Sequence, residues 1–282
     1  MVRTTPVFFI PNSVIVTQDE KILVAGTRTL SFKSYVKQDV LDRKSPQWFD
    51  PTVSVIYRLS LKGVIDKDFG DNGVVVLNET TSHSFRASVS LVIDKQGRIY
   101  LRGASGVPLN EFTSTWEKSE VFSDIEGSTT STSAYPSDFN SRFLYRFTPE
   151  GKPDVTFGSE GVIVVDNKRF PNLNTPPVPF VDADNHPLLA TGLSATPPTG
   201  ASDNKCGTNL LRYTEGGIPD ATFGKDKNGA SFIEADSSRL LTPQDCQMWV
   251  LSLVPSSLGR TTLVGTVVSD GRNYPFLTRF WN

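Results

Sequence analysis

A short motif that occurs three times constrains the fold of this chain more than any other feature. Each copy reads Asp-x-[Thr/Asp]-Phe-Gly and is followed by a further Gly and by apolar residues; the copies begin at Asp66, Asp154 and Asp220. Eight residues before each Asp, inside an apolar run, stands an Arg: Arg58, Arg146 and Arg212. A fourth apolar run, "PFLTRFWN", ends the chain and carries Arg279 in the same place. Recurrence of separated elements in a fixed order predicts a repeat architecture.

A second shared element precedes each of these Arg residues. It consists of an apolar run, a polar turn, another apolar run and a Gly; the glycines are Gly26, Gly103, Gly192 and Gly265. Apolar alternation between turns rich in Gly, Asp and Pro is typical of strands rather than helices. Each unit is therefore predicted to be strand, tight turn, strand, variable loop, strand, motif turn and strand.

Four such units predict an all-β fold, a four-bladed β-propeller. We expect a single domain over 1–282, with units at about 14–79, 88–167, 177–235 and 245–282. The last unit lacks a fourth strand, and residues 5–10 form a strand-like run before the first unit. We expect this N-terminal strand to close the last blade, with Val7–Ile10 beside Phe276–Phe280, because closure removes two exposed sheet edges.

Three stretches resemble the bacterial delta-60 repeat family, in which two such motifs recur in order. They are "DEKILVAG" from Asp19, "YRFTPEGKPDVTFGSEGVIVV" from Tyr145 and "LRYTEGGIPDATFG" from Leu211. The resemblance covers most of the chain outside the long loops. It implies a repeat β-propeller and carries over no activity and no catalytic residues.

The repeated motif residues are interpreted as scaffold. A short Asp side chain accepts backbone N–H groups in a turn, and Gly supplies positive φ. The Phe is expected to pack between neighbouring sheets, and the Arg to pair with the Asp, because buried charges are retained when they are paired. Asp66, Asp68 and Asp71 form the exception, a possible calcium site, although calcium needs six or more oxygens. We otherwise expect no metal and no cofactor.

No pattern in the sequence indicates catalysis. The two histidines are His83, in a segment that joins two blades, and His186, in a polar hairpin turn where we expect it to be solvated. The chain contains no G-x-S-x-G, no H-E-x-x-H and no C-x-x-C. We therefore predict no catalytic residues and a protein that is not an enzyme.

The variable loops are the predicted binding face. They span 27–51, 104–141 and 193–207, and in an up-and-down meander they leave the sheets at one face together with the links between blades. Their candidate binding residues are Trp48, Phe49, Phe112, Trp116, Phe122 and Tyr135. Rigid aromatic side chains beside Ser, Thr and Asn are typical of protein-binding surfaces. Such residues also pin long loops onto their own scaffold, which is the competing interpretation.

The leading hypothesis is a binding scaffold for a protein partner, and two alternatives stay open. The first is a lectin-like propeller in which Trp48 and Trp116 stack on sugar rings. The second is an enzyme with its site in the channel or under the long loops. A net charge of −2 gives no electrostatic case for nucleic acid, and no apolar run approaches the ~20 residues of a membrane span.

No signal peptide is visible, and the sequence leaves two compartments open: a secreted or cell-surface location and the bacterial cytoplasm. Cys206 and Cys246 are placed on adjacent blades at the long-loop face, either as a disulfide or as two thiols.

Overall fold

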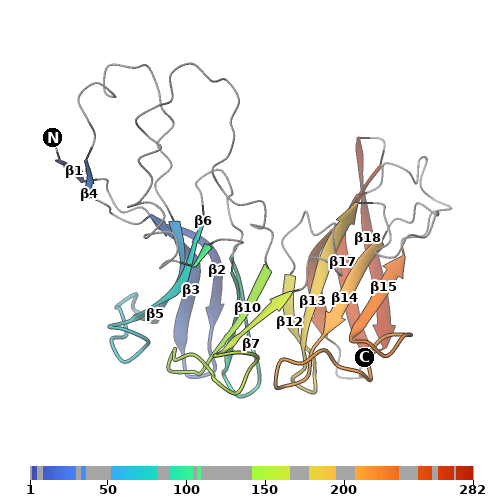
Figure 1. The fold of residues 1–282 in the computed structure, drawn as a ribbon, viewed down its shortest axis with the longest axis horizontal. Coiled ribbons are helices and arrows are strands. Elements are labelled where there is room, and N and C mark those ends of the chain that lie inside the picture. Colours follow the sequence, from blue (N-terminus) through green and yellow to red (C-terminus); the bar gives the residue numbers. More distant parts are fainter. Residues whose placement is uncertain are drawn as a thin grey trace. The chain divides into compact units, whose positions relative to one another are not determined.

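The computed structural model describes the strands of the chain and most of their tight turns. The described residues are 2–4, 9–29, 33–35, 52–81, 89–103, 107–108, 142–165, 178–194, 207–234, 247–255, 260–269 and 271–281. Every regular element among them is a β-strand (Figure 1). Within these ranges no helix has the length and apolar character needed to cross a membrane.

The chain divides into two compact units. One comprises Met1–Val16, Glu20–Val89 and Gly103–Ser141, and the other comprises Thr17–Asp19, Ser90–Arg102 and Arg142–Asn282.

The first unit contains one antiparallel sheet of five strands. In sheet order these are β2 (Phe9–Val16), β3 (Lys21–Thr29), β5 (Thr52–Ser60), β6 (Val74–Thr81) and β9 (Val107–Pro108). A separate pair joins β1 (Val2–Thr4) to β4 (Lys33–Tyr35). The strand β9 lies in the predicted long loop 104–141, so this loop begins by adding a short strand to β6.

The second unit contains three consecutive meanders. The first has β7 (Ser90–Ile93), β8 (Ile99–Gly103), β10 (Arg142–Phe147) and β11 (Val162–Val165). The next has β12 (Val178–Val181), β13 (Pro187–Ser194), β14 (Gly207–Arg212) and β15 (Ala230–Glu234). The last has β16 (Gln247–Pro255), β17 (Arg260–Ser269) and β18 (Arg272–Trp281). The end of β13 also pairs with the start of β16, which joins the last two meanders into one sheet.

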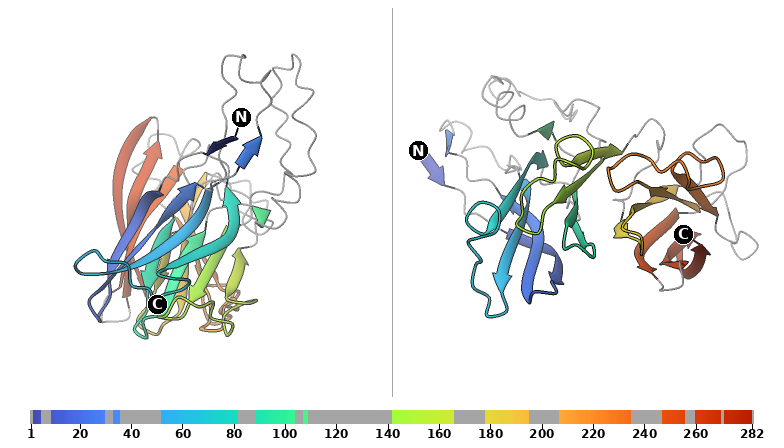
Figure 2. Two further views of the ribbon diagram at one scale, coloured as in Figure 1. Left: turned by 90° about the vertical axis from the view of Figure 1, so that its left-hand side faces the viewer. Right: turned by 90° about the horizontal axis from the view of Figure 1, so that it is seen from below.

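These four meanders confirm the predicted fold class: the chain is all-β, and its antiparallel sheets are the blades of a four-bladed β-propeller. The first blade is β2, β3, β5 and β6; the second is β7, β8, β10 and β11; the third is β12 to β15; the fourth is β16 to β18. Strands that are neighbours in a blade have neighbouring colours, because the chain runs up and down through each sheet (Figure 2).

The predicted closure of the last blade is wrong for the part of the N-terminal strand that the structure describes. Phe9 and Ile10 pair with Arg28 and Thr27 of β3, and β18 pairs with β17 alone among the described strands. Pairing with β3 runs from Val16 at the hairpin to Phe9, with a register shift between Pro11 and Ser13, so these residues extend β2. The ring of Phe9 also packs edge-on against Tyr57, with centroids 5.1 Å apart. Val7 and Phe8 lie outside the described residues.

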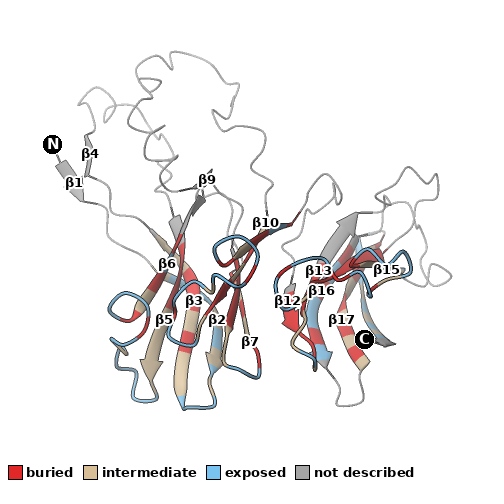
Figure 3. Ribbon diagram, turned by 60° about the horizontal axis from the view of Figure 1, so that its bottom comes forward, coloured by how far each residue is buried: buried red, intermediate tan, exposed pale blue. Residues whose placement is uncertain are grey.

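The core of the second unit lies between neighbouring blades. One cluster combines Leu144 and Phe157 of the second blade with Val181, Leu189 and Leu211 of the third. In Figure 3 the buried residues concentrate on the strands and the exposed ones on the turns; β17 alternates buried and half-buried positions along its length. A second cluster contains Phe223 of the third blade and residues of the fourth, so the predicted packing of the motif Phe between sheets is confirmed at both positions.

Candidate functional site

The motif turn of the second blade is built around a buried ion pair. The turn brings Asp154 back beside Arg146, and the backbone N–H of Asp154 donates to the carbonyl of Arg146 at 3.0 Å. Arg146 Nε then lies 2.7 Å from Asp154 Oδ2, and Nη2 donates to Thr156 Oγ1 at 2.8 Å. The Arg146 side chain is only 1% exposed, and the carboxylate of Asp154 neutralises its charge inside the protein.

The same arrangement recurs in two other blades. Arg212 Nε lies 2.7 Å from Asp220 Oδ2 in the third blade, and Arg58 Nε lies 3.0 Å from Asp66 Oδ2 in the first. In all three turns the guanidinium lies over the ring of the motif Phe, at 4.6 to 4.8 Å from its centroid. The predicted pairing of Arg with Asp is therefore confirmed for these three blades. In the fourth blade Arg279 is exposed and donates to Thr262 Oγ1 at 3.3 Å.

The pKa values of the motif carboxyls follow from these contacts. Burial raises the pKa of Asp154, but hydrogen bonds from Thr156 and Arg146 outweigh burial, so the pKa lies below its ordinary value. Thr222 and Arg212 lower the pKa of Asp220 in the same way, again against burial. These carboxylates are thus held in the ionised form by the scaffold.

The predicted calcium ligands of the first blade make contacts within the scaffold. The pKa of Asp66 is lowered, chiefly by its hydrogen bond from Lys21, whose Nζ lies 3.0 Å from Asp66 Oδ2. Asp66 Oδ1 accepts the backbone N–H of Asp68 at 3.3 Å, and Asp71 Oδ1 accepts from Asn72 Nδ2 at 2.8 Å. With Arg58 also bound, Asp66 has two cations and one backbone donor on its carboxylate, which leaves it a poor calcium ligand.

A different kind of cluster lies in the hairpin between β12 and β13. Val181 pairs with Pro187, and among the three residues between Asp182 and His186, Asn185 has a φ of 62°. Asp182 Oδ1 accepts the backbone N–H groups of Asp184 and His186, each at 2.9 Å. This is the turn chemistry that favours Asp at the start of a tight reversal.

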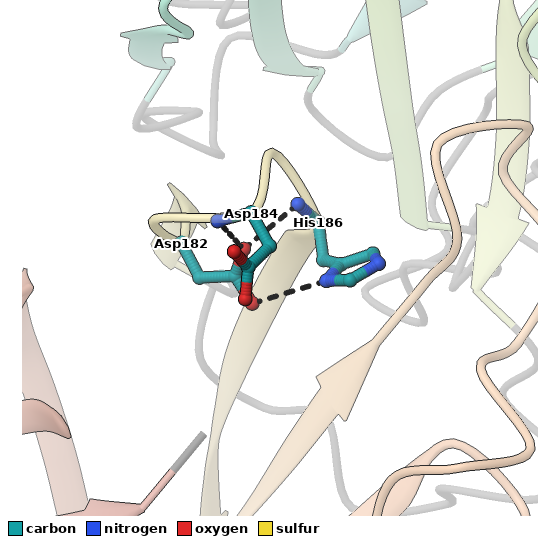
Figure 4. Close-up of side chains that lie close together, drawn as sticks. All are labelled: Asp182, Asp184 and His186. Carbon is teal, nitrogen blue, oxygen red and sulfur yellow. Dashed lines mark hydrogen bonds and ion pairs between the residues drawn. The ribbon is translucent and has the colours of Figure 1, made fainter. Parts of the chain in front are cut away.

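Three side chains of this hairpin converge (Figure 4). One ligand atom from each of Asp182, Asp184 and His186 lies within 4.8 Å of the other two, and Asp182 Oδ2 is 3.3 Å from His186 Nδ1. Asp182 is buried, Asp184 is exposed, and the His186 side chain is 31% exposed. Two carboxylates and an imidazole are ligands that a divalent cation accepts.

Sequence reasoning placed His186 in solvent and missed this cluster. The imidazole is in fact half-buried, and its Nδ1 atom is buried. The available signal was the spacing Asp-x-Asp-x-His within a tight turn, which brings alternate side chains to one side of the hairpin.

The predicted binding residues lie outside the described part of the chain. They are Trp48, Phe49, Phe112, Trp116, Phe122 and Tyr135. His83, Cys206 and Cys246 lie outside it as well, so the disulfide stays a prediction.

Comparison of the chain with models of known families, with curated proteins and with solved structures gives no match. The resemblance to the delta-60 repeat family therefore stays a prediction, carried by the quoted motifs alone.

Proposed function

We propose that this protein is a non-enzymatic binding scaffold that recognises a protein partner through the segments 27–51, 104–141 and 193–207. The observation that carries the proposal is the uneven length of one class of connection. In the fourth blade, β17 ends at Ser269 and β18 begins at Arg272, so two residues join the second strand to the third. In the other three blades the corresponding connections are the long segments.

The direction of the strands indicates that the two ends of a blade carry different kinds of connection. In the third blade, Leu188 pairs with Arg212, so the first hairpin and the motif turn share one end of the sheet. The chain leaves β13 for 195–206 at the opposite end. Ion pairs stabilise the first end, and β13 leads into its long segment from the second; long connections on a rigid scaffold are typical of binding loops.

The composition of the long segments supports a protein partner. They carry Trp48, Phe49, Phe112, Trp116, Phe122 and Tyr135 among Ser, Thr and Asn. Aromatic residues that become buried on association supply most of the binding free energy in protein interfaces, and small polar residues adapt around them.

The decisive experiment replaces 104–141 with a short Gly–Ser linker. Partners that co-purify with the full chain are identified, and the affinity of the purified partner is measured for both proteins. We expect at least a tenfold loss of affinity with a melting temperature within a few degrees of the full chain, since the only described strand that is removed is the two-residue β9 at the edge of the first sheet. A partner that binds the shortened protein equally well would overturn the proposal.

A matched variant separates side-chain recognition from loop length. Trp116→Ser with Phe122→Ser keeps the full segment and removes two of its aromatic anchors. We expect this variant to lose affinity in the same direction as the shortened protein. Binding of the full chain to glycans on an array, with no protein partner recovered, would favour the lectin-like alternative.

A further inference from the structure

We propose that Asp182, Asp184 and His186 form a site for one divalent transition-metal ion of the zinc class. This site is independent of the proposed function, because the hairpin lies at the end of the third blade opposite the end where β13 finishes at Ser194.

Asp182 is a buried carboxylate, and one of its oxygens has no hydrogen bond among the described residues. The Asp182 side chain is 0% exposed, and its Oδ1 accepts two backbone N–H groups. Its Oδ2 is buried 3.3 Å from His186 Nδ1, an ion-pair contact only when the imidazole is protonated, and among the described residues neither atom has a hydrogen bond. Two backbone N–H groups compensate the buried carboxylate only at Oδ1, so a group that supplies positive charge beside Oδ2 is favoured.

The second blade shows how an equivalent hairpin supplies that charge. Asp94 Oδ1 accepts the backbone N–H groups of Gln96 and Arg98, at 3.0 and 2.9 Å. Asp94 Oδ2 accepts from Arg98 Nε at 2.6 Å, so its second oxygen has a permanent cation. Ile93 pairs with Ile99 here as Val181 pairs with Pro187 in the third blade, which makes His186 the counterpart of Arg98.

The same position carries a permanent cation in the remaining blades. Val16 pairs with Ile22 in the first blade and Pro255 with Thr261 in the fourth, which makes Lys21 and Arg260 the counterparts of His186. The third blade alone places an imidazole there. A neutral imidazole brings no charge of its own, but it is the commonest protein ligand for a metal ion that does.

The hairpin of the third blade also carries a second carboxylate, Asp184. Asp184 stands at the position of Gln96 in the second blade, so the hairpin that has lost the permanent cation has gained an anionic ligand. Two carboxylates and Nδ1 within 4.8 Å leave net negative charge around the imidazole. A divalent cation between them offsets this repulsion.

The geometry fits a small tetrahedral ion. Metal–ligand distances of about 2.0–2.1 Å place neighbouring ligand atoms about 3.3–3.4 Å apart around a tetrahedron. Asp182 Oδ2 and His186 Nδ1 are separated by 3.3 Å. A nitrogen ligand favours zinc and its neighbours over calcium or magnesium, and three protein ligands leave one position for water. Lys95 Nζ donates to the carbonyl of Ala183 at 2.6 Å and fixes the hairpin between the two carboxylates.

The test is calorimetric titration of the EDTA-treated full chain with zinc chloride. We expect one ion per chain, and a rise in melting temperature with zinc because the ion binds the folded state. Asp184→Asn removes an exposed ligand and should weaken binding at least tenfold. His186→Arg recreates the pair that Arg98 makes with Asp94, so it should abolish binding while the melting temperature in EDTA stays at least as high as that of the unmodified chain.

Two results would overturn the proposal. One is the absence of saturable zinc binding by the full chain. The other is equal binding by Asp184→Asn and the unmodified chain, which would place the ion elsewhere, for example on Cys206 or Cys246. Cobalt chloride provides a second readout, because thiolate ligands give charge-transfer bands that a site of one imidazole and two carboxylates lacks. The decision rests on Asp184→Asn if His186→Arg fails to fold.

Discussion

At the scale of single residues, the buried guanidinium of the motif turn depends on its carboxylate. Arg146 is 1% exposed and pairs with Asp154 at 2.7 Å. We expect Asp154→Ala to lower the free energy of unfolding by about 3–5 kcal/mol, because it leaves a buried charge without its partner. Urea unfolding measures the change.

The fourth repeat provides the control for this substitution. Arg279 occupies the same place in the repeat but is exposed. Arg279→Ala should therefore change the free energy of unfolding by less than about 1 kcal/mol. Equal losses for the two variants would show that burial of the pair is not what makes the motif stabilising.

The motif carboxyls also predict how stability depends on pH. Asp66, Asp154 and Asp220 each have a folded pKa lowered from 3.8, so their contribution to stability is fully present above pH 3.8. It is lost as pH falls below 3.8 through the folded pKa values, because the native state must then take up protons. Melting temperature measured from pH 5 to pH 2 should fall, and fall less steeply in Asp154→Asn. Parallel curves for the two proteins would contradict this assignment.

At the scale of strands and turns, the sequence predicted the features that depend on neighbouring residues, namely the motif turns and the strands between them. One tight turn accounts for the spacing of Arg146 and Asp154. The Asp and Gly residues that form this turn lie close together in the sequence, so the turn is recognised directly. The four blades follow in the same way, from alternation between such turns. These predictions needed no knowledge of which strand is the neighbour of which.

The prediction that the N-terminal strand closes the last blade was wrong because the partner of a strand is not decided by its local sequence. Phe9 and Ile10 read equally well as a strand of the last blade or as the beginning of β2. The hairpin register with β3 decides between these, and Gly26 accommodates the result, since a Cβ there would lie 2.2 Å from the carbonyl oxygen of Ile10. Such a close approach between backbones requires glycine.

The metal cluster was missed for a related reason. A polar turn with two Asp residues and a His is typical of a solvated loop. Its significance appears only when the register aligns His186 with Lys21, Arg98 and Arg260, so that each of the other blades has a cation at this position. The long segments offered no local pattern beyond their aromatic composition.

At the scale of the whole molecule, the motif also connects blades. Arg146 donates through Nη1 to the carbonyl of Glu215 in the third blade, in addition to its pair with Asp154. The backbone N–H of Gly158 donates to the carbonyl of Gly216 at 2.9 Å, and Arg98 Nη1 lies 2.5 Å from Glu215 Oε1. One turn of the third blade therefore supports both the motif turn and the first hairpin of the second.

Two adjacent glycines in that turn test whether blades are stabilised as a unit. Gly217 has a φ of +82°, and a Cβ there would lie 2.8 Å from the backbone nitrogen of Gly158 and 3.0 Å from the Phe157 ring. Gly217→Ala should therefore cost about 1–2 kcal/mol for the backbone conformation, and more for displacing the second blade. Gly216→Ala is the control, since its nearest neighbours lie 3.9 Å away.

Hydrogen exchange locates the damage. Because the clash of Gly217→Ala falls on atoms of the second blade, we expect faster amide exchange at Gly158 and Arg146 as well as at Tyr213 beside the substitution. Gly216→Ala should leave all three amides protected. Faster exchange confined to the third blade would show instead that each sheet is stabilised by its own turn, and that the bonds between blades add little to the stability of either.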